Sequence, residues 1–122
     1  MTDAAPAIER LTKRSEFLAC AKAPSCAKGA VVVQALARND HARLIRVGFT
    51  ATKRIGGAVE RNRAKRRMRE AARALLPMFA APGIDYVIIA RGGVLTRPWP
   101  RLLDDVKSAL IRLAADREGP HI

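Results

Sequence analysis

The stretch from Lys53 to Pro77 constrains the fold most, because it predicts one long helix with two unlike faces. It holds nine of the chain's 23 lysine and arginine residues but only two acidic residues, Glu60 and Glu70. On a helical wheel one side is apolar and the other is polar and cationic. The apolar stripe is Ala64, Met68, Ala71, Ala72 and Leu75, and the polar face is Asn62, Lys65, Arg66, Arg69 and Arg73. Such a helix packs on a core with one side and presents cations with the other.

Glycine and proline mark the expected limits of this helix. Gly56 and Gly57 give the backbone freedom to turn into the helix. Pro77 lacks the amide hydrogen that the next turn needs, so we expect the helix to end near Leu76.

The charge of this helix favours a polyanionic partner. Glu70 can pair with Arg66 or Arg73 at helical spacing, but most of the other cations have no carboxylate within reach. A polyanion relieves the repulsion among crowded cations, and the planar arginine side chain suits two-point contacts with phosphate. The net charge of +12 points the same way. The alternative is a solvated helix surface with its charges in ion pairs, which the shortage of carboxylates disfavours. We therefore predict nucleic-acid binding.

The 122 residues fit one α+β domain with a small central sheet. We expect the element order α-β-β-α-β-α in a domain of residues 11–117, with flexible tails at 1–10 and 118–122. The two strands before the basic helix should form an antiparallel hairpin, and that helix should connect the second strand to the third. The expected helices are 12–23, 58–76 and 98–116, the strands are 29–37, 43–50 and 85–90, and 24–28 is a linker.

The expected sheet has one open face. In strand 43–50, apolar residues alternate with Arg46, Gly48 and Thr50, so one face is buried and the other is small and polar. We expect a nucleic-acid strand on this open face, where Gly48 lets a backbone approach. Strand 29–37 is apolar on both faces, so its pattern leaves the choice open, and we assign Val33 and Ala35 to the open face.

Residues for catalysis by the protein itself are missing from this pattern. Cleavage of RNA needs converging carboxylates that hold metal ions or a histidine acid–base pair. The neighbouring Asp104 and Asp105 point about 100° apart on a helix, and Cys20 and Cys26 are expected to be reduced thiols. We expect no protein-bound metal or cofactor. Because no export signal or membrane-length apolar run is visible, we expect a cytoplasmic protein without a membrane partner.

The basic stretch also resembles a known family. The residues Lys53-Arg54-Ile55-Gly56-Gly57-Ala58-Val59, then Arg61-Asn62-Arg63, Lys65-Arg66 and Arg69-Glu70, are similar to the signature of the protein subunit of bacterial ribonuclease P. The resemblance extends more loosely over residues 11–113. It implies the element order αβββαβα, a fold like domain 2 of ribosomal protein S5, and a left-handed strand–helix–strand crossover.

The resemblance implies a division of labour between protein and RNA. The RNA subunit would hold Mg²⁺ and cut precursor tRNA to give the mature 5′ end, and the protein, without an obligate protein partner, would bind that RNA and the 5′ leader. The residues implied for RNA binding are Lys53, Arg54, Arg61, Asn62, Arg63, Lys65, Arg66, Arg69 and Arg73. Those for the leader are Phe17, Val33, Ala35, Thr50, Thr52 and Arg61. Phe17 is equally suited to a core position or to stacking on a base.

Two other classes of protein remain as alternatives. A ribosomal or other structural RNA-binding protein would share the charge and the fold without a cleft for a leader. A protein-only nuclease would cleave RNA without an RNA subunit.

Overall fold

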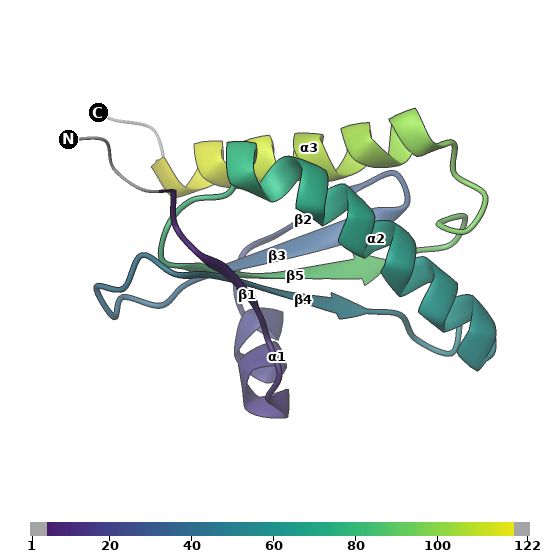
Figure 1. Cartoon of the computed structure of the whole chain (residues 1–122), viewed down its shortest axis with the longest axis horizontal. Helices are drawn as coiled ribbons and strands as arrows, with labels where there is room; N and C mark the ends of the chain where they lie inside the picture. Colours follow the sequence, from purple (N-terminus) through teal and green to yellow (C-terminus); the bar gives the residue numbers. More distant parts are fainter. Residues whose placement is uncertain (1–4, 119–122) are drawn as a thin grey trace.

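The computed structural model describes residues 5–118 as a five-stranded sheet with helices on both faces (Figure 1). Two longer helices, α2 and α3, cover one face, and the short helix α1 lies against the other. The order of strands across the sheet is β1-β4-β5-β3-β2. The elements are β1 (Ile8–Arg10), α1 (Arg14–Ala21), β2 (Ser25–Lys28), β3 (Val31–Ala37), β4 (Ile45–Thr50), α2 (Ala58–Phe79), β5 (Ile84–Ala90) and α3 (Trp99–Glu118).

The core lies between the sheet and the pair α2 and α3. Alternate residues of the three central strands point into it, among them Val33, Phe49 and Ile88. The apolar stripe predicted for the basic helix is confirmed, since Ala64, Met68 and its other members are buried. None of the helices described here is long and apolar enough to cross a membrane.

Two strands were not expected from the sequence pattern, although the order αβββαβα that the resemblance implied includes the second of them and is confirmed from α1 onward. Residues 8–10, assigned to a flexible tail, form β1 and pair in parallel with β4, as Ile8 lies opposite Ile45. Residues 25–28, assigned to a linker, form β2 and pair antiparallel with β3. Both strands are short and mostly exposed, so they lack the apolar alternation that identifies a strand. The rest of the expected N-terminal tail, residues 1–4, and residues 119–122 lie outside the described part of the chain.

The expected hairpin between the first two long strands is wrong. β3 and β4 do not pair with each other, because β5 lies between them, antiparallel to β3 and parallel to β4. The β4–α2–β5 crossover is confirmed. In Figure 1, α2 lies above the sheet and β4 lies on the β1 side of β5. The crossover is therefore left-handed, as the resemblance implied, although such connections are usually right-handed.

The predicted end of the basic helix is also wrong by one turn. α2 continues through Pro77 to Phe79, and the amide of Ala80 donates to the carbonyl of Leu76 at 3.0 Å. Proline has a backbone φ that suits a helix, and its missing amide removes only one bond. The helix ends at Phe79, because the backbone of the next residue, Ala80, is extended.

Candidate nucleic-acid interface

The polar face of α2 is a surface of cations with few partners. Its one ion pair among the described residues joins Arg73 to Glu70 at 3.5 Å, and both side chains are exposed. A surface pair of this kind contributes about 0–1 kcal/mol, so it leaves the charge of the face largely uncompensated. Of the predicted RNA-binding residues, Lys53, Arg54, Asn62, Arg63, Arg66 and Arg73 are exposed, and Arg61, Lys65 and Arg69 are half-buried.

Arg61 and Arg67 of this helix bind backbone carbonyls outside it. The Arg61 Nη1 donates to the carbonyl of Gly56 at 3.0 Å, next to the start of the helix. The Arg67 guanidinium donates to the carbonyls of Val94 and Arg97, at 2.5 and 2.6 Å, and so ties α2 to the loop before α3. Arg67 therefore belongs to the structure of the domain and not to the exposed cationic face.

The opposite face of the sheet is the one that α1 covers in part. The ring of Phe17 lies on Gly48 so closely that a Cβ there would meet it at 2.5 Å. Phe17 is half-buried beside a small apolar cluster that includes Leu11 and Val87, so it is part of the packing and still reaches the surface. Thr50 is half-buried at the end of β4, and Thr52 is exposed just beyond it.

The assignment of Val33 and Ala35 to this open face is wrong. Both are buried in the main core, opposite Ile88 and Tyr86 of β5. Because side chains alternate along a strand, Val32 and Gln34 take the open face instead. A strand that is apolar on both faces gives no signal for this choice, which is decided by its pairing with β5.

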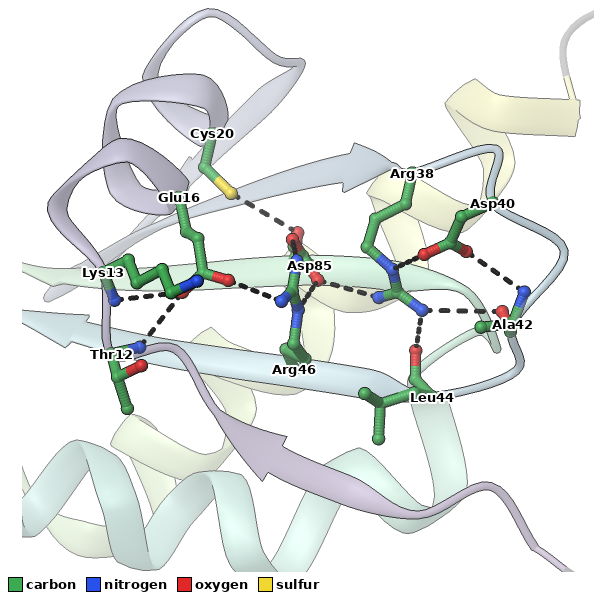
Figure 2. A network of polar contacts seen from close by, with 10 residues as sticks. All are labelled: Thr12, Lys13, Glu16, Cys20, Arg38, Asp40, Ala42, Leu44, Arg46 and Asp85. Atoms are coloured by element: carbon green, nitrogen blue, oxygen red, sulfur yellow. Dashed lines mark hydrogen bonds and ion pairs between the residues drawn. The ribbon is translucent and has the colours of Figure 1, made fainter.

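A buried ionic network fastens α1 to this face (Figure 2). At its centre is Asp85 of β5, only 2% exposed, which accepts hydrogen bonds from Arg38 at 2.8 Å and from two nitrogens of Arg46 at 2.8 and 2.6 Å. The remaining nitrogen of Arg46 pairs with Glu16 of α1. Arg46 is thus fully occupied by carboxylates, although it lies on the open face.

The surroundings of α1 change the pKa values of two of its side chains, Glu16 and Cys20. Hydrogen bonds from the backbone amides of Lys13 and Thr12, at 3.0 and 3.2 Å, together with the charge of Arg46, lower the pKa of Glu16. Burial raises the pKa of Cys20 to about 11, so its thiol is protonated at neutral pH. Cys20 and Cys26 are both unpaired, as expected. No cluster of three potential metal ligands occurs in residues 5–118.

A hollow of about 740 Å³ lies where β4 and β5 end. Thr52, Lys53 and Arg54 line it from the end of β4, and Arg91 lines it from the end of β5. Arg91 follows β5 directly, and its place beside this hollow was not anticipated. The signal was available, because the carboxyl ends of two parallel strands meet at one edge of a sheet.

The fold and this surface define a small α+β RNA-binding domain with an exposed cationic helix on one side and a half-covered sheet on the other. The family model described as Ribonuclease P matches residues 5–114. A ribonuclease P protein component of Caulobacter vibrioides is 67% identical over 108 residues, which cover 88% of this chain and 72% of the relative. One of Ruegeria pomeroyi is 49% identical over 93% of both chains.

A solved structure agrees with these relatives. The ribonuclease P protein of Thermotoga maritima matches with a TM-score of 0.71 at 25% identity, over 84% of this chain and 96% of that one. The chain described here belongs to the ribonuclease P protein family.

Proposed function

We propose that this chain, as the protein subunit of ribonuclease P, binds the RNA subunit with the cationic face of α2 and the 5′ leader of precursor tRNA on the α1 side of the sheet. The observation that carries the proposal is the uncompensated charge of α2. Arg63, Arg66 and Arg73 are exposed, and within residues 5–118 only Arg73 of the three forms an ion pair, with Glu70. Two polyanions must come together in this complex, and cations between them lower the electrostatic cost.

The leader would follow the open face of β4. Gly48, where we expected a backbone to approach, is buried under the ring of Phe17, so that expectation is wrong. Phe17 itself offers the edge of a ring, and Thr50 offers a hydroxyl. Beyond Thr50, the hollow with Lys53, Arg54 and Arg91 would take the phosphates of the same strand. Single-stranded nucleic acid suits this route, because the route offers a ring edge and a hydroxyl and ends at three cations.

Catalysis would belong to the RNA subunit, with Mg²⁺ bound there. The described residues offer no converging set of carboxylates, since Asp85 and Asp105 are buried and each is bound to arginine. Binding and positioning of RNA are the tasks that the side chains of this chain support. We place the complex in the cytoplasm. A purely ribosomal role finds no support in the relatives reported above, which are named as ribonuclease P protein components.

Reconstitution tests the proposal. The chain is combined with a bacterial ribonuclease P RNA at low Mg²⁺, and the release of the 5′ leader from a precursor tRNA is measured. We expect stimulation by the wild-type chain and a loss of RNA-subunit affinity in the double variant Arg63→Glu, Arg66→Glu. Both positions are exposed, so the fold should persist. Cleavage without any RNA subunit, or unchanged affinity of the double variant at moderate salt, would contradict the proposal.

A further inference from the structure

A groove of about 320 Å³ runs between β1 and the second half of α2. Its floor contains Phe49 of β4 and Leu76 of α2, and Ile8 of β1 lies at its side. Phe49 belongs to the face of the sheet that α2 covers. The groove is therefore on the other side of the sheet from Gly48 and the proposed path of the leader.

Three arginines line this groove, and no acidic residue does. Arg10 is exposed on β1, Arg69 is half-buried with a shielded Nε that has no acceptor, and Arg73 has only its 3.5 Å contact with Glu70. Arg46, by contrast, uses all three of its side-chain nitrogens on carboxylates. The groove is thus a local excess of positive charge with unused hydrogen-bond donors, which fits an anion.

The apolar floor narrows the chemistry of that anion. Inorganic phosphate would satisfy the arginines but would leave the apolar surface of Ile8 and Pro77, the exposed apolar residues of the groove, in water. A nucleotide has both parts, a phosphate for the arginines and a flat base for an apolar floor.

We propose that this groove holds one unstacked nucleotide of the RNA subunit, with its phosphate on Arg10 and Arg73 and its base against Ile8 and Pro77, above the buried Phe49 and Leu76. The inference rests on the proposed function and extends it, because β1 supplies a contact that the cationic face of α2 does not contain. It makes Arg10 a binding residue and β1 part of the interface with the RNA subunit.

The free protein provides a first test. Amide and side-chain NMR signals of the full chain are followed while AMP, or inorganic phosphate at the same ionic strength, is added to millimolar concentration. We expect AMP to shift signals of Ile8, Phe49 and Leu76 in the wild type, and phosphate to leave these three unchanged. Ile8→Glu places a carboxylate in the groove and should abolish the shifts. The matched control Ile111→Glu alters an isoleucine on α3 that is 49% exposed, against 39% for Ile8, and should keep them. Equal effects of AMP and phosphate, or AMP shifts that survive Ile8→Glu, would overturn the inference.

The RNA subunit provides the second test. Arg10→Gln should weaken its binding and reduce the slope of log affinity against log salt by about one, and Ile8→Glu should weaken binding by roughly tenfold. The control Arg101→Gln, exposed at the start of α3, should bind as the wild type does. If Arg63→Glu with Arg66→Glu weakens binding but Ile8→Glu does not, the groove is refuted and the proposed function stands. If neither weakens it, the proposed function itself fails.

Discussion

At the scale of single residues, some arginines are bound inside the domain and others are exposed, and the sequence alone does not distinguish the two groups. Arg46 donates hydrogen bonds to the carboxylates of Asp85 and Glu16. Arg67 donates to two backbone carbonyls. Arg63 and Arg66 are exposed on the same helix as Arg67. We expect the first group to affect the stability of the fold and the second group to affect the affinity for RNA.

Substitution of Arg67 tests this separation. In Arg67→Ala the carbonyls of Val94 and Arg97 lose a charged donor, so the free energy of unfolding should fall by about 2 kcal/mol. The neighbouring Arg66→Ala, which removes an exposed side chain, should change it by less than about 0.5 kcal/mol. Urea denaturation of both variants measures the difference, and similar values for the two would show that Arg67 is not a structural residue.

At the scale of elements, α1 depends on its contacts with the sheet. It has eight residues, and a helix of that length is not stable by itself in water. It is held by the ring of Phe17 on Gly48 and by the pairing of Glu16 with Arg46. Because α1 covers part of the open face, this pairing also determines how much of that face stays accessible to the leader proposed to bind there.

The pairing of Glu16 predicts a pH dependence. Since the folded protein lowers the pKa of Glu16 from its usual 4.5, the unfolded chain binds a proton more readily, and folding is favoured when the pH is above that value. This contribution is lost as the pH falls through the lowered pKa of the folded state. Wild type should therefore be more stable than Glu16→Gln at pH 7, and the two should converge at low pH.

Urea midpoints of both proteins from pH 7 to pH 3 measure this convergence. Asp40 also has a lowered pKa, through its hydrogen bond with Arg38, but it titrates in both proteins and cancels in the difference. Glu70→Gln is the matched control, because Glu70 is exposed and has only a long contact with Arg73. A difference between wild type and Glu16→Gln that stays constant with pH would rule out a role for the charge.

At the scale of the whole molecule, a net charge of +12 makes association with RNA sensitive to salt. Each phosphate that a cation neutralises releases bound counterions, so the logarithm of affinity falls with the logarithm of salt concentration. Arg66→Ala should reduce that slope by about one. Arg112→Ala should leave it unchanged, because Arg112 lies on α3 and pairs with Asp116 at 3.3 Å. Equal slopes for the wild type and both variants, from filter binding at several salt concentrations, would contradict a phosphate contact by Arg66.

Periodicity predicted all the elements that have a strong pattern of their own. The stripe from Ala64 to Leu75 located α2 and its buried side, and the alternation in β4 located its open face. The short strands β1 and β2 had no such pattern, because their contribution is mostly backbone hydrogen bonding to a neighbour. Periodicity also does not say which strands pair with each other, so a hairpin of β3 and β4 was predicted although β5 lies between them.

The amino-acid sequence by itself determined the cationic helix, its buried stripe and the family, since charge, helical spacing and the motif are local properties. Only the tertiary structure decided which face Val33 takes, that Arg46 and Arg67 are occupied, and that Arg10 joins Arg69 and Arg73 at one groove. Each of these depends on which partner atoms distant parts of the chain bring within a few ångströms, and neither composition nor periodicity carries that information.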